Sequence, residues 1–160
     1  MTLKIVVSVS DAKVSRDAED VISTYSLGSC IGVTAYDPIV KAGGMLHFQL
    51  PEAAASGARA AERPAMFADT GLALLIDGLK RLGAQERRLQ IVLAGGAKIL
   101  DESNTFNIGR RNHAAIRKCL WQRGLMVARE DCGGAAPRHM FLTIATGDTQ
   151  IKAVGLAAAA

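Results

Sequence analysis

Aromatic residues are scarce, at 4% of the 160 residues. A core with so few rings must be built mostly from Leu, Ile, Val, Ala and Met, and the sequence lacks the aromatic platform on which single-stranded nucleic acids stack. The formal net charge of +4 is also too small to favour a nucleic-acid-binding protein, although it is compatible with an acidic protein partner. We therefore expect no nucleic-acid partner.

Cysteine is rarer still. The three thiols, Cys30, Cys119 and Cys132, are odd in number and widely spaced, which argues against a disulfide framework. Neither a Cys-x-x-Cys nor a His-Glu-x-x-His spacing occurs, so we expect no metal and no cofactor. No apolar run approaches the length of a membrane span, and the N-terminus lacks the basic start and long apolar stretch of a signal peptide. These features predict a cytoplasmic protein without membrane insertion.

The hydrophobic content of 49% and the charged content of 21% are typical of a globular protein. With no repeat and no linker, we expect one domain over residues 1–160. Two long helices are predicted over residues 64–82 and 108–123, with Pro64 and Asn107 at their starts and glycines at their ends. Residues 11–20 are predicted to be a connection or short helix, and residues 51–62 a loop. Strands are predicted at 3–8, 21–27, 30–36, 43–50, 89–93, 125–130, 139–145 and 150–155. Runs of strands without regular helix alternation predict an α+β layered fold, in which a mixed or antiparallel sheet packs with two main helices.

The predicted hairpin over residues 30–50 carries the strongest chemical signal. Its apolar residues alternate, so one face should be the core face, formed by Ile31, Val33, Ala35, Leu46, Phe48 and Leu50. Opposed residues of an antiparallel pair share a face, and one allowed register sets Ile31 against Leu46 and Cys30 against His47. A slip of two residues would keep Cys30 and His47 on the same face. The periodicity therefore gathers a thiol and an imidazole on the face away from the core.

A thiol beside an imidazole can act as a nucleophile, because the base removes the thiol proton. Backbone N–H groups near Gly28 and Ser29 could stabilise an oxyanion, and the Thr24 hydroxyl could orient His47. The alternative is that Cys30 is a small buried hydrophobe and His47 is structural.

The other thiols and imidazoles carry weaker signals. Cys119 should pack within the second helix, and the acidic neighbours Glu130 and Asp131 should disfavour a thiolate at Cys132. His113 is expected on an exposed helix surface, and His139 could be exposed or structural.

Several blocks of the sequence resemble the family of CheD, the chemoreceptor glutamine deamidase. The blocks in the first half are Leu27-Gly28-Ser29-Cys30, Tyr36-Asp37-Pro38, Gly43-Gly44-Met45-Leu46-His47 and Leu50-Pro51. Those in the second half are Gly95-Gly96-Ala97, Asn107-Ile108-Gly109-x-Arg111-Asn112 and Glu130-Asp131-Cys132-Gly133-Gly134, followed by Arg138 and Thr146-Gly147. The resemblance covers roughly residues 20 to 152, and it departs from the family pattern at Cys132, where a small aliphatic residue is expected.

The resemblance implies a Cys–His–Thr catalytic set, which falls here on Cys30, His47 and Thr24. It also implies a fold similar to the deamidating domain of certain bacterial toxins. The implied substrates are glutamines on the cytoplasmic helices of methyl-accepting chemoreceptors, and the implied regulatory partner is the phosphatase CheC. Two alternatives stay open: a binding module with weak or lost catalysis that holds a receptor or a CheC-like phosphatase, and a hydrolase of receptor glutamyl methyl esters.

Overall fold

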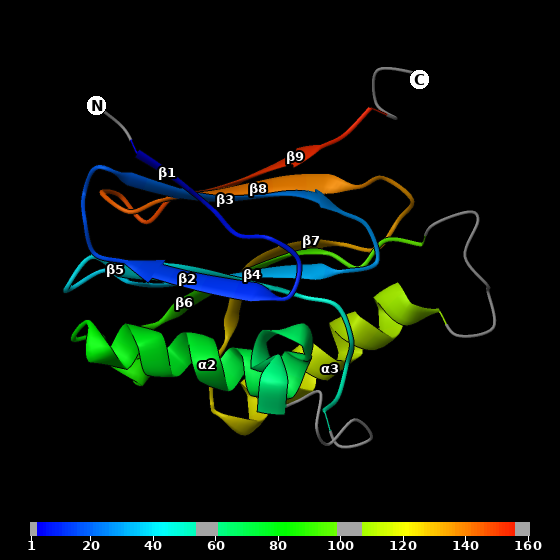
Figure 1. Cartoon of the computed structure of the whole chain (residues 1–160), viewed down its shortest axis with the longest axis horizontal. Coiled ribbons are helices and arrows are strands. Elements are labelled where there is room, and N and C mark those ends of the chain that lie inside the picture. The colour runs from blue at the N-terminus through cyan, green and yellow to red at the C-terminus, as the bar shows by residue number, and fades with distance from the viewer. Residues whose placement is uncertain (1–2, 54–60, 99–106, 156–160) are drawn as a thin grey trace.

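The computed structural model describes residues 3–53, 61–98 and 107–155, and these form three layers (Figure 1). A four-stranded sheet lies over a five-stranded sheet, and two helices cover the far face of the five-stranded sheet. The predicted α+β layered fold with two main helices is thus confirmed, with the difference that the strands divide between two sheets.

The two sheets are both mixed. The four-stranded sheet has the order β1-β3-β8-β9 and consists of β1 (Leu3–Val6), β3 (Asp20–Leu27), β8 (Arg138–Thr143) and β9 (Thr149–Ala153). The five-stranded sheet has the order β2-β5-β4-β6-β7 and consists of β2 (Asp11–Ser15), β5 (Ala42–Phe48), β4 (Ile31–Asp37), β6 (Gln90–Gly95) and β7 (Val127–Cys132). The β1–β3 and β6–β7 pairs are parallel, and the other strand pairs are antiparallel.

The two main helices are α2 (Ala68–Arg81) and α3 (Ile108–Gln122), and short 3₁₀ turns form at η1 (Pro64–Met66) and η2 (Glu86–Arg88). Leucines at positions 72, 75 and 79 of α2 are buried, as expected for residues three and four apart on one helical face. The predicted glycine stops are confirmed, since Gly83 and Gly124 follow the helices with positive φ angles of 94° and 71°. Asn107 lies at the N-cap of α3, but its side chain makes no capping hydrogen bond.

Two secondary-structure predictions were wrong. Residues 11–15 of the predicted connection or helix form β2, which pairs along β5 and gains sheet hydrogen bonds there, and only residues 16–19 connect β2 to β3. The predicted helix over residues 64–82 is interrupted at Phe67, whose backbone is extended. Phe67 is fully buried and forms an isolated bridge with Leu50, so its tertiary contacts override the helical pattern. Much of the predicted 51–62 loop, residues 54–60, lies outside the described residues.

Apolar side chains fill both spaces between the layers. Between the helices and the five-stranded sheet lie Ile31, Val33, Ala35, Leu46 and Phe48, which confirms five of the six residues predicted for the core face of the hairpin. The sixth, Leu50, is partly buried and packs against a separate small cluster. Between the two sheets lies a second cluster formed by Val7, Ile22, Leu27, Tyr36, Met45, Ala94, Met140, Leu142 and Ile144. The face of the hairpin expected to lie away from the core is therefore a buried inter-sheet layer. The sequence pattern missed it because both faces of β4 and β5 are covered.

Within the described ranges, no helix combines the length and apolar character needed to cross a membrane.

Candidate active site

Cys30 lies where the chain crosses from β3 in one sheet to β4 in the other (Figure 1). The carbonyls of this crossing, Gly28 to Cys30, are all hydrogen-bonded. The Gly28 carbonyl accepts from the Ala97 amide at 2.8 Å, and the Cys30 carbonyl accepts from the Gly96 amide at 2.9 Å. The Ser29 carbonyl accepts from the Asn112 side chain at 3.0 Å. The backbone that carries the thiol is thus held by Gly96 and Ala97, which follow β6, and by α3.

The register of the β4–β5 hairpin differs by two residues from the register that faced Cys30 with His47. Ile31 pairs with Phe48, and Gly32 pairs with His47. Cys30 precedes β4 by one residue, is half-buried and packs against the inter-sheet cluster. The contact of Cys30 with the inter-sheet cluster places it beside the layer in which His47 meets Thr24, and Gly32 is the β4 residue directly opposite His47.

Thr24 reaches His47 from the other sheet. The Thr24 Oγ1 lies 2.7 Å from the His47 Nδ1, and the same hydroxyl donates to the Val7 carbonyl at 2.7 Å. A hydroxyl has one proton, so Thr24 must accept the second hydrogen bond, and His47 Nδ1–H donates it. The imidazole is therefore held in the tautomer whose Nε2 has a free lone pair.

The burial of His47 sets its charge. The side chain is 2% exposed, and burial lowers its pKa from 6.5 to about 4. Its Nε2 is buried and makes no hydrogen bond within the described parts of the chain. At neutral pH this histidine is a neutral imidazole with an available lone pair, which is the state that a general base requires.

Asn112 was missed as a site residue by the sequence reasoning. It is fully buried in α3, and its Nδ2 donates to the Ser29 and Gln49 carbonyls, each at 3.0 Å. It thereby ties the residue before Cys30 to the segment after His47. The signal that could have revealed it is its spacing of four from Ile116, which puts a polar amide on the apolar stripe of the helix.

The remaining thiols lie apart from this site. Burial, reinforced by Glu130, raises the pKa of Cys132 to about 12, which bears out the expectation that a thiolate is disfavoured there. Burial also raises the pKa of Cys119.

The remaining histidines both contact neighbours. His113 is not simply exposed, because its Nε2–H donates to the Glu130 carboxylate at 2.8 Å. His139 is structural in part, since its Nδ1 accepts from the Ser26 amide at 3.0 Å.

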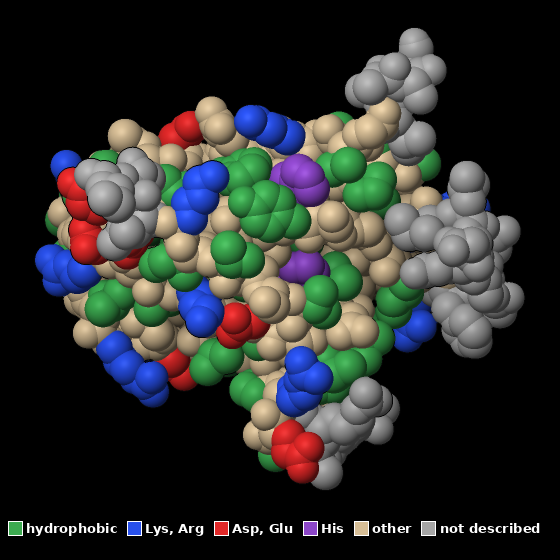
Figure 2. Space-filling model, turned by 45° about the horizontal axis from the view of Figure 1, so that its top comes forward, with side chains coloured by type: hydrophobic (Ala, Val, Ile, Leu, Met, Phe, Trp, Pro, Cys, Tyr) green, Lys and Arg blue, Asp and Glu red, His purple; other side chains and the backbone are tan. Residues whose placement is uncertain are grey.

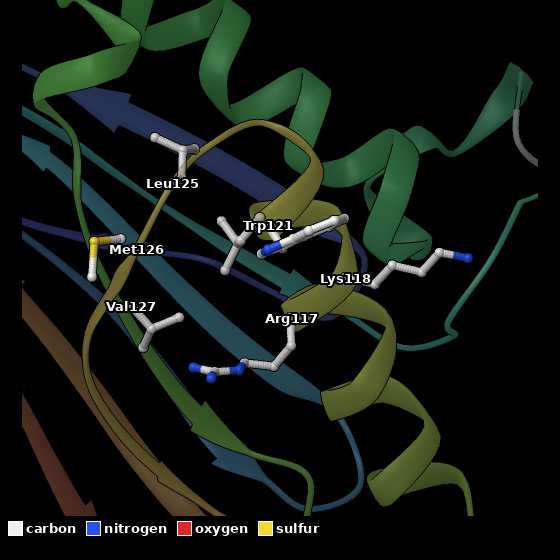
Figure 3. A pocket seen from close by; sticks show the side chains of 7 residues that line it. Arg117, Lys118, Trp121, Leu125, Met126 and Val127 are labelled. Carbon is white, nitrogen blue, oxygen red and sulfur yellow. The ribbon is translucent and has the colours of Figure 1, made fainter.

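A separate hollow of about 450 Å³ lies between the end of α3 and the start of β7 (Figure 3). Trp121 and Met126 are 80% and 84% exposed at this groove, and Arg117 extends along it. None of the candidate catalytic side chains lines it. Elsewhere, the face in Figure 2 shows basic and acidic side chains interspersed among apolar ones.

A thiol, a neutral imidazole and an orienting hydroxyl in one buried layer are the groups that thiol-dependent hydrolases use. Comparison with known proteins agrees with this class. The family model described as CheD chemotactic sensory transduction matches residues 49–153. The chain belongs to the CheD family.

Curated relatives match over nearly the whole chain. The "Probable chemoreceptor glutamine deamidase CheD 1" of Syntrophus aciditrophicus (strain SB) is 43% identical over 151 residues, covering 94% of each chain. The "Probable chemoreceptor glutamine deamidase CheD" of Solibacter usitatus (strain Ellin6076) is 45% identical over 144 residues, covering 90% of this chain and 85% of the relative. A relative with the same name from Pyrococcus abyssi (strain GE5 / Orsay) is 41% identical over 156 residues, covering 96% and 94%.

Proposed function

We propose that this protein is a chemoreceptor glutamine deamidase, which hydrolyses glutamine side chains on the cytoplasmic helices of chemoreceptors to glutamate and ammonia. The observation that carries the proposal is the hydrogen bond from His47 to Thr24, which leaves the other imidazole nitrogen available in the layer that Cys30 borders. The chain acts as one domain in the cytoplasm, where receptor helices of this kind are accessible.

The proposed reaction has two halves. In the first, His47 Nε2 takes the Cys30 thiol proton while the sulfur attacks the carboxamide carbon. His47 then gives its proton to the departing ammonia, leaving a thioester. In the second half, His47 takes a proton from water, the hydroxide displaces the thiolate, and the proton returns to sulfur. Atoms and charges balance, so the cycle needs no cofactor.

Backbone amides near Cys30 supply the proposed oxyanion stabilisation. In a planar trans peptide the N–H points opposite to the C=O. The Gly28 and Ser29 carbonyls point toward Ala97 and Asn112, so the Ser29 and Cys30 amides point away from those two partners. These two amides are the donors that we assign to the tetrahedral oxyanion.

Mass spectrometry of a purified chemoreceptor cytoplasmic fragment, incubated with the protein, tests the proposal. We expect glutamine-to-glutamate conversion, seen as a mass increase of about one dalton, with the intact protein and none with Cys30→Ala. Cys119→Ala is the matched control and should retain conversion, because that thiol lies in α3 outside the site. Conversion by Cys30→Ala would contradict the assignment of the nucleophile.

The same experiment separates the alternatives. Methanol release from a methylated receptor fragment would identify a methylesterase, because thiolate acyl transfer serves both leaving groups. Tight binding of the fragment without either product would identify a binding module. A CheC-like phosphatase is the proposed regulatory partner, and it should inhibit deamidation if it covers the Cys30 surface.

A further inference from the structure

Three potential metal ligands of different types converge between α3 and β7, and the proposed reaction uses none of them. The His113 imidazole, the Glu130 carboxylate and the Cys132 thiol have ligand atoms that all lie within 4.8 Å of one another. We call these residues the His113–Glu130–Cys132 cluster.

Strand geometry accounts for the cluster. Glu130 and Cys132 are two apart on β7, so their side chains share the face that looks toward α3. The residues between and before them, Asp131 and Arg129, face the other way and bond to Arg138 and the Thr149 carbonyl.

α3 supplies the third ligand. His113 faces Glu130 at 2.8 Å, and Arg117, one turn further along α3, lies 3.8 Å from the same carboxylate. Contacts of Glu130 with two α3 side chains thus hold the helix and β7 together where the three ligands meet.

We propose that the His113–Glu130–Cys132 cluster binds one divalent transition-metal ion of the zinc class. Imidazole, carboxylate and thiolate are all zinc ligands, and metal–ligand bonds of about 2.0–2.3 Å give tetrahedral ligand-to-ligand spacings of about 3.3–3.8 Å. When the ion binds, the ligand atoms must shift to this spacing from separations of up to 4.8 Å, and from 2.8 Å for His113 and Glu130. Water would take the fourth position.

Charge and proton balance set the strength of the site. The thiolate and the carboxylate together neutralise the two positive charges of the ion. Binding must release the Cys132 thiol proton to solvent and shift the His113 N–H proton from Nε2 to Nδ1. Arg117 and Arg138 are cations close to Glu130 and Asp131, so they oppose the ion and limit its affinity.

The position of the cluster connects it to the nucleophile. Cys132 pairs with Gly95 on β6, and the next residue, Gly96, donates to the Cys30 carbonyl. The cluster on β7 is thus separated from the Cys30 backbone by a single strand, β6, and it lies on the helix-covered side of the sheet.

Titration calorimetry with zinc chloride tests the proposal in a Cys30→Ala background, because Cys30 and His47 are a second thiol and imidazole that could take the metal. We expect one ion per chain. Adding Cys132→Ser should weaken binding at least about tenfold, since loss of even an outer partner costs 10–100-fold. Adding Cys119→Ser, the matched thiol control, should leave the affinity unchanged.

Cobalt absorption and thermal melting give independent readings. Cobalt should produce a sulfur-to-metal charge-transfer band that Cys132→Ser removes, and zinc should raise the melting temperature only while Cys132 is present. Circular dichroism verifies that each variant is folded. Absence of binding in Cys30→Ala, or equal binding in all three variants, would overturn the proposal.

Discussion

Thr24 Oγ1 has a single proton, and the Val7 carbonyl accepts it. This hydrogen bond sets the tautomer of the neighbouring imidazole, because His47 Nδ1 must then be the donor to Thr24, which leaves Nε2 as the base in the proposed reaction. At the residue scale, the role we propose for Thr24 is therefore to position His47 for the reaction.

Replacing Thr24 with valine should lower kcat about 10–100-fold, because the buried His47 Nδ1–H loses its acceptor and the base loses its fixed tautomer. Thr24→Ser keeps the hydroxyl and should restore most of the activity. Nitrogen NMR of His47 checks the cause, since the Nδ1–H tautomer should dominate in the wild type and in Thr24→Ser. Full activity in Thr24→Val, or an unchanged tautomer, would contradict this role.

The pH dependence of stability should report the burial of His47. With a folded pKa of about 4 against 6.5 unfolded, only the unfolded chain takes up a proton as the pH falls below 6.5. The free energy of unfolding should therefore decline between about pH 6.5 and pH 4, by about 3 kcal/mol in total.

Urea denaturation across this pH window measures the decline, and His47→Gln should remove most of it. The titration of Asp37 does not contribute to the decline in stability between pH 6.5 and pH 4. Burial raises its pKa, but hydrogen bonds from Arg88 and two backbone amides hold the pKa at about 2, so its contribution is lost only below about pH 4. If the free energy of unfolding falls equally with pH in His47→Gln, the decline does not come from protonation of His47.

At the scale of elements, the site depends on α3 as well as on the hairpin. Asn112 donates to the Ser29 and Gln49 carbonyls, so one amide holds both the residue before Cys30 and the segment after His47. Its own Oδ1 is buried without a partner among the described residues. Burying an unpaired oxygen destabilises the fold, so we infer that Asn112 serves to position the two segments that its amide nitrogen holds.

Asn112→Ala should destabilise the protein by about 1–3 kcal/mol, because two buried carbonyls lose their donor. It should also lower kcat more than it raises KM, since the nucleophile loop is displaced while the outer surface is unchanged. Gln122→Ala removes an exposed amide from the same helix and should change stability by less than about 0.5 kcal/mol. Equal effects of the two substitutions would refute the positional role.

At the scale of the whole molecule, polar bonds cross an otherwise apolar space between the sheets. Thr24 meets His47, Thr34 Oγ1 lies 2.9 Å from Thr149 Oγ1, and Tyr36 donates to the Ile144 carbonyl at 2.8 Å. The spacing of the two sheets therefore fixes the distance between the orienting hydroxyl and the base.

Gly32→Ala should disturb that spacing. A Cβ at Gly32 would lie 2.8 Å from the Met140 sulfur and 2.9 Å from a Leu27 methyl, both in the inter-sheet layer. We expect a loss of about 1–3 kcal/mol by chemical denaturation and a parallel loss of activity. Adding Met140→Ala should relieve the crowding, so the double variant should be more stable than the sum of the single effects predicts. Strict additivity would argue against crowding as the cause.

The strands and helices were largely predictable because apolar periodicity depends on local sequence. The exceptions had tertiary causes: β2 is held by its partner β5, and Phe67 is drawn out of a helix by its bridge to Leu50. The hairpin register was displaced by two residues, which alternation alone does not distinguish. The predicted likeness to toxin deamidating domains stays a prediction.

By itself, the sequence determined that His47 lies on the hairpin face opposite Leu46 and Phe48, because side chains alternate along any strand. Only the tertiary structure decided that this face is buried under a second sheet, that Thr24 reaches His47 across the gap, and that Asn112 holds both segments. The reason is physical: a strand's period fixes which side a residue faces, whereas what covers that side depends on contacts between segments far apart in the chain.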